Sequence, residues 1–379
     1  MGTLWVHPLT LRALNALAMG KAFLRYRNPR RRASGRHQTE FYEQTWAAAA
    51  EELGGTWTRL GSDMSQIDLD GRRTRIYHNV TEIDNPVTLA LLHDKPLTHR
   101  LLAAEGLPVP QHAVFSLKQM RPAIDFLQRT AGRDCVVKPA GGTGGGRGVT
   151  TGIQTLSHLA RAAALAAVYA DELLIEEQIA GDNYRLLYLD GTLIDAFVRR
   201  LPAVTGDGKS TVARLVYQAN DERLRSRAGV SQVLLTIDLD MRRTLAKQGL
   251  TLRSVPEAGR RVTLKTVVNE NSGADNTTAT GVLCSAIVDD GATAARAMDA
   301  RFLGIDMVLT DPAIPLRQSG GVILEVNGTP NLYYHYKKAD GSFPVAVHLL
   351  RRIFWPATDG QPPRHGSAKD ASLREVANV

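Results

Sequence analysis

The sequence predicts a protein of the α/β (α+β) class with more than one domain. Its 379 residues are enough for two or three domains, and 44% hydrophobic residues are enough for a sizeable core. The apolar runs Cys135–Val137 and Leu173–Ile175 have the length expected of buried strands. Between them, Thr155–Tyr169 has the apolar spacing of a helix. Strands and helices therefore follow one another along the chain, which is typical of a mixed fold.

The positive charge of the chain is concentrated in a basic N-terminal arm, residues 1–38. The arm holds 8 of the 46 lysine and arginine residues and no acidic residue, so the remaining 38 balance the 38 acidic residues. Residues 9–26 have the pattern of an amphipathic helix, and Arg30–Gly35 is expected to be a linker. The arm is either a partly ordered extension or a helix that contacts a membrane surface or a partner. Because the rest of the chain is neutral, no nucleic-acid partner is expected.

Hydropathy and cysteine usage narrow the class of protein further. The chain has no run of 18 apolar residues, so we expect no transmembrane segment. The two cysteines, Cys135 and Cys284, are far apart in the sequence. Lone cysteines without short spacing are typical of reduced, buried thiols in a cytoplasmic protein, and not of a disulfide or a zinc site.

Residues 39–110 are expected to form a small N-terminal α/β domain. Its elements are predicted in chain order: a helix in residues 39–60 stopped by Gly54-Gly55, strands at 64–69 and 74–77 around the turn Asp70-Gly71, and a helix from Lys95 to Ala104. The proline-rich stretch 107–110 is expected to link this domain to the next.

Residues 111–180 are expected to form a central domain around a glycine-rich loop. A helix near Leu117–Thr130 leads into the strand at Cys135, which continues to Lys138 and whose pairing Pro139 should stop. Six of the eight residues in 141–148 are glycine, so backbone N–H groups could approach an anion without obstruction by side chains. A lysine at the end of a strand followed by such a flap would suit a triphosphate. By itself, however, the loop is equally well explained as a plain surface loop.

Residues 181–354 are expected to form the C-terminal domain, and 355–379 a disordered tail. The predicted elements are a hairpin about Asp190-Gly191, helices within 211–249, and strands at 304–310 and 322–326. The stretch Gly206–Thr211 resembles a phosphate-binding loop. It lacks the first glycine and the preceding apolar strand of that motif, so we interpret it as a structural turn.

Two of these strands carry acidic residues in apolar surroundings. Asp306 lies in the first, and Glu325 and Asn327 lie two residues apart, hence on one face, in the second. An unpaired acid in a core strand is costly. Two carboxylates and an amide oxygen could instead hold Mg²⁺, with phosphates and water completing its coordination. Either acid alone could equally be a structural carboxylate in an ion pair.

The order of these motifs resembles the ATP-grasp superfamily. The motifs are DKPLT, VVKP with its glycine loop, EE-x-I-x-G-x-x-Y-R, GDGKST, GID and ILEVNGTP, and they run from about Asp94 to Tyr336. The resemblance is greatest to the ATP-grasp domain of cyanophycin synthetases and to the glutathione-synthetase half of bifunctional glutathione enzymes. It implies an ATP-grasp fold, with a small N-terminal α/β domain and ATP held between a central lid domain and a C-terminal domain.

The resemblance also implies roles for individual residues. Lys95 and Lys138 would hold the phosphates of ATP, and Asp306, Glu325 and Asn327 would bind two Mg²⁺ ions, with Mn²⁺ as an alternative and Glu325 bridging. Further implied positions are the flap over the γ-phosphate (Gly144, Gly145 and Gly146), the adenine hinge (Glu176, Glu177 and Ile179) and the ribose contact (Asn183). Arg185 would face the γ-phosphate or the substrate carboxylate.

The chemistry implied is ATP-dependent carboxylate–amine ligation. The carboxylate attacks the γ-phosphate, and an amine then displaces phosphate from the acyl phosphate to form an amide or peptide bond. The substrates would be small molecules or peptides, and homo-oligomerisation is left open. Two other interpretations remain: a kinase of the same fold, or a nucleotide-binding partner protein without catalysis.

Two further features bear on substrate recognition. Arg199 and Arg200 end a predicted strand, so only one of them can enter the cleft between domains, where it would form a fork with Arg185 for the carboxylate. The segment Asn269–Asp275 replaces the acceptor-pocket stretch of the relatives and adds acidic residues. Those acids would repel a poly-acidic substrate, so cyanophycin is not the expected product.

Overall fold

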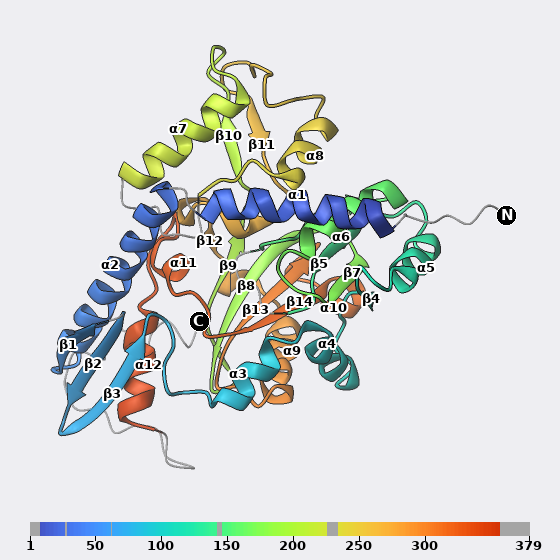
Figure 1. Ribbon diagram of the computed structural model, residues 1–379. Coiled ribbons are helices and arrows are strands. Elements are labelled where there is room, and N and C mark those ends of the chain that lie inside the picture. The colour runs from blue at the N-terminus through green and yellow to red at the C-terminus, as the bar shows by residue number, and fades with distance from the viewer. Residues whose placement is uncertain (1–7, 27–28, 62, 142–145, 226–233, 357–379) are drawn as a thin grey trace.

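The computed structural model describes residues 8–26, 29–61, 63–141, 146–225 and 234–356 (Figure 1). For 21–26 and 29–33 it describes the backbone alone. The expected disordered tail therefore lies outside the described residues, apart from its first two positions. None of the described helices is both long and apolar enough to cross a membrane.

A five-stranded antiparallel sheet carries the acidic residues. Its strand order is β12-β9-β8-β13-β14. The strands are β8 (Asp182–Leu189), β9 (Thr192–Arg199), β12 (Thr277–Thr278), β13 (Phe302–Leu309) and β14 (Val322–Gly328). β8 and β9 form the predicted hairpin, with both turn residues, Asp190 and Gly191, at positive φ. One face of the sheet packs on α9 (Ser285–Ala297) in the largest hydrophobic cluster. The opposite face carries Arg185 and Asp306 beside apolar residues such as Leu187, which pack in the cluster of the N-terminal unit.

A four-stranded sheet, ordered β4-β7-β5-β6, carries the glycine-rich loop. Its strands are β4 (His112–Phe115), β5 (Cys135–Pro139), β6 (Thr150–Ile153) and β7 (Leu173–Glu177), and it is covered by α5 (Arg121–Arg129) and α6 (Leu156–Ala166). Pro139 is the last residue of β5 and the last to pair with β7, opposite Leu173, so strand pairing ends at the proline as predicted. The proline ring removes only an N–H donor at the strand end, which this position tolerates.

The N-terminal part folds as the three-stranded sheet β1-β2-β3 (Thr56–Gly61, Met64–Leu69 and Arg72–Tyr77) against α2 (Pro29–Glu52) and α12 (Val345–Phe354). β2, β3 and their Asp70-Gly71 turn were predicted, whereas β1 was missed. The linker predicted at Arg30–Gly35 is wrong, since these residues lie in α2. Arginine favours helices, so a basic run does not by itself break one.

Residues 203–225 and 234–264 build a smaller unit with its own hydrophobic cluster. It contains β10 (Ala203–Thr205), β11 (Arg261–Thr263), α7 (Val212–Arg225) and α8 (Leu239–Lys247). The GDGKST stretch forms the predicted turn, in which Asp207 Oδ1 accepts hydrogen bonds from the backbone N–H groups of Lys209 and Ser210. The Asp207 carboxylate therefore occupies these two backbone N–H groups, which a bound phosphate would otherwise need.

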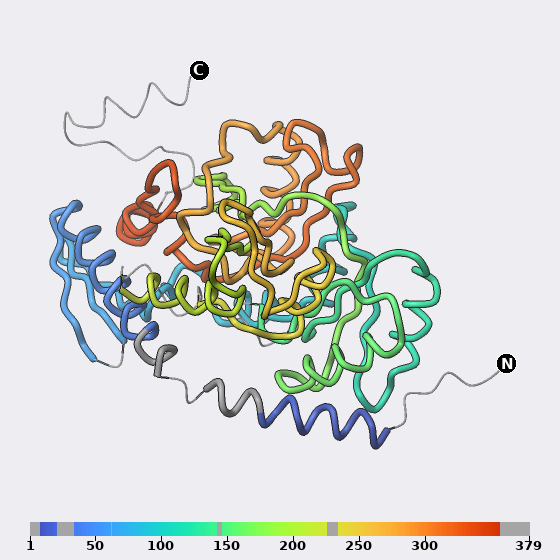
Figure 2. The backbone as a smooth tube through the Cα atoms, turned by 90° about the horizontal axis from the view of Figure 1, so that it is seen from above, coloured from blue at the N-terminus to red at the C-terminus, as the bar shows by residue number. Residues whose placement is uncertain are grey.

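The remaining helices connect these units. They are α1 (Pro8–Tyr26), α3 (Pro86–Leu92), α4 (Lys95–Ala104), α10 (Leu316–Ser319), α11 (Tyr333–Tyr336) and three short 3₁₀ turns (Val268–Glu270, Gly273–Asp275 and Thr280–Val282). Figure 2 shows α1, the helix predicted in the basic arm, running along the outside of the molecule beside α6. There Asn15 Nδ2 donates to the backbone oxygen of Ala164 at 2.9 Å. Cys135 is buried and Cys284 only partly so, and neither is in a disulfide. The domain boundaries expected at 38, 110, 180 and 354 stay predictions.

Replacing Trp46 by alanine should destabilise the N-terminal unit. The indole is 1% exposed and donates from Nε1 to the backbone oxygen of His78 at 2.7 Å. We expect a loss of about 3–5 kcal/mol in the free energy of unfolding, measured by urea denaturation. Trp355→Ala is the control, because that side chain is 42% exposed and its loss should leave the unfolding midpoint nearly unchanged.

Candidate active site

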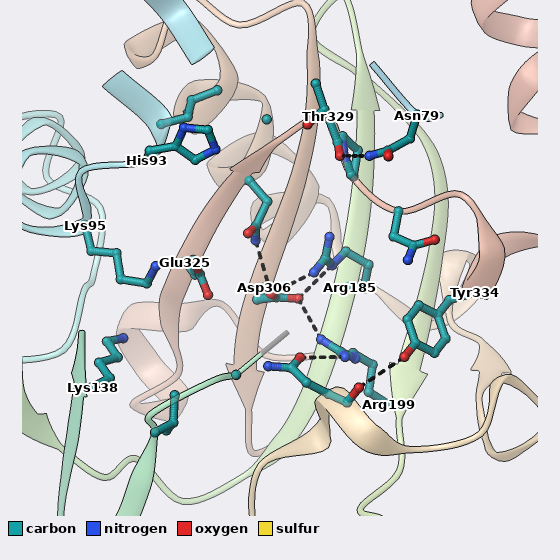
Figure 3. Close-up of a pocket in the computed structure, with 18 of the residues that line it drawn as sticks. Asn79, His93, Lys95, Lys138, Arg185, Arg199, Asp306, Glu325, Thr329 and Tyr334 are labelled. Carbon is teal, nitrogen blue, oxygen red and sulfur yellow. Dashed lines mark hydrogen bonds and ion pairs between the residues drawn. The ribbon is translucent and has the colours of Figure 1, made fainter. Parts of the chain in front are cut away.

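One pocket of about 360 Å³ brings together most of the predicted site residues. They come from both large sheets, from the start of α4 and from the described end of the glycine loop (Figure 3). The predicted residues that line the pocket are Lys95, Lys138, Gly146, Arg185, Arg199, Asp306, Glu325 and Asn327. Its volume is within the range of small-molecule sites in proteins.

Lys95 is held at the first turn of α4. Asp94 caps the helix by accepting a hydrogen bond from Leu97 N, and Lys95 N donates to the backbone oxygen of Ala140, beside the glycine loop. Lys95 is 8% exposed, and its Nζ lies 2.8 Å from Glu325 Oε1. The cap and the backbone contact therefore fix the ammonium group between the glycine loop and the acidic strand.

Lys138 reaches the pocket because side chains alternate along β5. Cys135 and Val137 point into the core against α5 and α6, which places Lys138 on the pocket face. Its Nζ lies 2.7 Å from Glu176 Oε1. Glu176 is 2% exposed, and its Oε2 has no partner among the described residues. The ammonium group is therefore held by a buried carboxylate on the neighbouring strand.

The predicted adenine and ribose residues lie outside the lining of this pocket. Glu177 forms an ion pair with Arg133, and Ile179 follows β7 in the connection to β8. Asn183 lies in β8, in register with Arg199. Since the adenine role was expected to fall on backbone groups, these assignments and that of Glu176 stay predictions. Gly144 and Gly145 lie outside the described residues.

Asp306 and Glu325 meet because β13 and β14 pair in register at these two residues. Asn327, two residues further along β14, donates from Nδ2 to Asp306 Oδ2 at 3.2 Å. Burial alone would raise the pKa of Glu325, but the charges of Lys95 and Lys138 outweigh it and hold that pKa below its ordinary value. The Glu325 carboxylate is thus kept ionised at neutral pH.

The oxygen donors of this cluster fit Mg²⁺. Asp306, Glu325 and Asn327 all line the pocket. The cluster has only two carboxylates, and among the described residues there is no group of three or more His, Cys, Asp and Glu side chains that could hold a metal. Two carboxylates and an amide would leave coordination positions for phosphate oxygens and water, as Mg²⁺ usually requires.

Arg185 faces Asp306 directly from the neighbouring strand. The two residues pair in register between β8 and β13, and Arg185 donates from Nε and Nη2 to the two carboxylate oxygens at 2.7 and 2.9 Å. Of the two arginines at the end of β9, Arg199 enters the pocket and is 6% exposed. Arg200 points away and contacts Asp182 at 3.3 Å. The structure thus makes the choice between adjacent residues that the sequence left open.

The sequence missed several residues that line the pocket. They include Asn79, Phe197, Asn331 and Tyr334. Tyr334 follows the ILEVNGTP motif by four residues, and Phe197 shares a strand face with Arg199, so these two carried a usable signal. Asn79 follows β3 in the N-terminal unit and carried none, because its approach to Thr329 is a tertiary contact.

The acidic residues of the segment Asn269–Asp275 do not line the pocket, where they were predicted to repel a poly-acidic substrate. Glu270 pairs with Lys265 at 2.8 Å and accepts from Thr236 N at 2.7 Å. Asp275 accepts from Ser272 N at 3.1 Å. Both carboxylates are engaged away from the pocket, and of this segment only Asn269 is among the lining residues.

Comparisons with known proteins agree with this arrangement, although no protein-family model matches the chain. The chain is 31% identical to a cyanophycin synthetase of Nostoc sp. over 321 residues, which are 83% of this chain and 35% of that protein. It is 33% identical to the glutathione biosynthesis bifunctional protein GshAB of Enterococcus faecalis over 285 residues, 73% of this chain and 37% of that protein. The chain thus spans little more than a third of the length of these curated relatives.

A solved structure supports the same fold. The bifunctional glutathione synthetase from Pasteurella multocida matches with a TM-score of 0.54 and 22% identity, over 83% of this chain and 44% of that one. The sequence relatives, the shared fold and the lysines and acids gathered in one pocket show that this chain belongs to the ATP-grasp superfamily.

Proposed function

We propose that the protein is an ATP-dependent carboxylate–amine ligase that forms an amide bond and releases ADP and phosphate. The observation that carries this proposal is the pocket itself, which combines two lysines, two acids and two arginines within one cavity. The names of the sequence relatives support it, because both are names of biosynthetic proteins: a cyanophycin synthetase and a glutathione biosynthesis protein. The substrates would be a small-molecule or peptide carboxylate and an amine.

The residues along the pocket would have different roles. Lys95 and Lys138 would bind the phosphates of ATP as point charges. Arg185 would hold the attacking carboxylate with its planar fork and then stabilise the acyl phosphate. Asp306, Glu325 and Asn327 would bind Mg²⁺, two ions on the present proposal, or Mn²⁺ in its place. The metal would supply charge neutralisation to the transferring phosphoryl group.

The glycine loop would exclude water during the reaction. Gly146 has φ +68°, and a Cβ at this position would lie 2.6 Å from Asn269 Nδ2 and 2.9 Å from Val267 Cγ1. Gly146, at the described end of the loop, therefore packs closely on Asn269 and Val267. Such closure would protect an acyl phosphate from hydrolysis.

Gly146→Ala should impair turnover through this close packing. Left-handed strain and the displaced neighbours should lower kcat/KM by about tenfold to a hundredfold. Gly132→Ala is the matched control, because Gly132 has φ +85° but nothing within 4 Å of the added Cβ. If both variants lost activity equally, the closure of the loop on Asn269 would not be the cause.

The proposed activity is tested by incubation with ATP, Mg²⁺ and pools of carboxylates and amines. We expect ADP and phosphate, and a product whose mass equals the two substrates less one water. AMP and pyrophosphate would contradict the proposal. A phosphorylated product formed without an amine would show a kinase, and nucleotide binding without ADP release would show a binding protein.

A further inference from the structure

The end of the pocket near Arg199 carries a buried positive charge whose shortest hydrogen bond is to an uncharged partner. In Figure 3, Arg199 and Tyr334 lie on the opposite side of the site from Lys95 and Lys138. Arg199 Nη2 donates to Asn269 Oδ1 at 2.8 Å, and its guanidinium carbon lies 5.5 Å from the centroid of the Tyr334 ring. An amide and an aromatic ring orient a guanidinium group but do not neutralise it.

The acid nearest to Arg199 is already used by another arginine. Among the described residues, the one ion pair of Arg199 is with Asp306, at 3.6 Å. The same carboxylate accepts the two shorter hydrogen bonds from Arg185 and one from Asn327. Arg199 Nε has no partner among the described residues. One carboxylate thus faces two guanidinium groups, and a buried cation without a counter-ion is costly.

The geometry agrees with this count of charges, because the guanidinium groups of Arg185 and Arg199 approach the same oxygen of Asp306, at 2.7 and 3.6 Å. Any cation that bound Asp306 would weaken its attraction for both arginines further. An additional anion at this end of the pocket would therefore be stabilised.

We propose that Arg199, Asn269 and Tyr334 form a subsite for a second carboxylate group of the carboxylate substrate. The inference rests on the proposed ligase function and narrows its substrates to compounds with two acidic groups. Arg185 would hold the carboxylate that is activated, and Arg199 the one that is not. Both guanidinium groups reach the same oxygen of Asp306, so the two carboxylates belong to one small molecule.

The nucleotide is the other source of anions in this pocket. Its phosphates have Lys95 and Lys138 at the opposite side, next to Glu325 and the glycine loop. The neutral partners of Arg199 favour an organic acid instead, because Tyr334 and Phe197 supply apolar surface beside the guanidinium group. Binding measurements with and without the organic acid separate these two sources.

The test measures binding without turnover by isothermal titration calorimetry, with Mg²⁺ and a non-hydrolysable ATP analogue present. The probes are malonate, succinate and glutarate, each compared with its own monoamide, which keeps the shape and loses one charge. For at least one chain length, the wild-type protein should bind the diacid about tenfold more tightly than the monoamide. Arg199→Gln should remove this preference by weakening the diacid alone.

Two further variants make the result specific to the geometry of Arg199. Arg199→Lys keeps the charge but loses Nε and the planar fork, so it should restore only part of the preference. Arg200→Gln is the matched control on the exposed neighbour and should keep the wild-type preference. Circular dichroism and melting temperature check folding, and Arg199→Lys carries the test if the glutamine variant does not fold.

The proposal is overturned if no diacid is preferred by the wild-type protein, or if Arg199→Gln weakens diacid and monoamide equally. It is also overturned if this variant weakens the ATP analogue measured alone, since the anion would then be a phosphate. A diacid preference without any ligase turnover would support the subsite and contradict the proposed function. If monoacids were turned over as efficiently as diacids, the result would support the proposed ligase function and contradict the subsite.

Discussion

Glu325→Ala is expected to lower ADP release by about a thousandfold or more while leaving the fold intact. The side chain lies in register with Asp306 and 2.8 Å from Lys95. Its loss would remove one of the two carboxylates proposed to bind Mg²⁺ and would leave the Lys95 ammonium without its partner. The measurement is a coupled assay of ADP release with the substrate pair found in the product screen, together with calorimetric binding of the Mg²⁺ complex of the ATP analogue.

Two variants control for the loss of side-chain volume and for charge elsewhere. Glu325→Gln keeps the shape and should be nearly as inactive, because the amide is a weaker metal ligand and does not attract Lys95 as a carboxylate does. Glu105→Ala removes an exposed acid at the end of α4 and should leave turnover unchanged. Appreciable activity in Glu325→Ala with a wild-type melting temperature would place the metal site elsewhere.

Arg185→Lys is expected to lower kcat by about a hundredfold to a thousandfold and to leave the affinity for ATP nearly unchanged. Arginine donates two hydrogen bonds to Asp306 at 2.7 and 2.9 Å, and one ammonium group cannot reproduce this planar geometry. The charge is retained, so an effect on the reaction without an effect on nucleotide binding would assign Arg185 to the carboxylate. Steady-state kinetics and calorimetry with the ATP analogue measure the two quantities separately.

The same substitution at Arg200 is the matched control for this prediction. Arg200 is exposed, and its partner Asp182 lies 3.3 Å away at the surface, so Arg200→Lys should behave as the wild type. Wild-type kinetics in Arg185→Lys would remove that residue from the site. A loss of ATP affinity as large as the loss of kcat would instead assign it to the nucleotide.

Much of the candidate site could be predicted from the sequence, because its motifs follow local rules. Lys138 lies one residue before the end of β5 and shortly before a glycine loop, and Asp306, Glu325 and Asn327 lie in short apolar strands. Burying a polar residue in such a strand costs folding free energy unless the residue has a partner or a functional role. Each of these residues therefore stands out in the sequence. The order of the motifs then indicated the superfamily, which the sequence relatives confirmed.

The predictions that failed depended on the surroundings of a residue. The linker expected at Arg30–Gly35 is helical, and the acids of the segment Asn269–Asp275 are engaged by Lys265, Thr236 and Ser272. A charged residue has the same local pattern whether it meets solvent, substrate or an internal partner. Only the residues packed around it decide which of these it contacts.

The sequence by itself determined the strands that carry the site, their turns and the identity of the charged residues, since these follow from side-chain alternation and backbone preferences of neighbouring residues. It also determined that Arg199 and Arg200 point in opposite directions. Which of them enters the pocket was decided by the tertiary structure, because that depends on which face of the sheet packs on α9. The pairing of Lys138 with Glu176, and the meeting of Arg199 with Asn269 and Tyr334, likewise join residues far apart in the chain. Contacts of this kind arise only when separate elements pack together, and no local pattern encodes them.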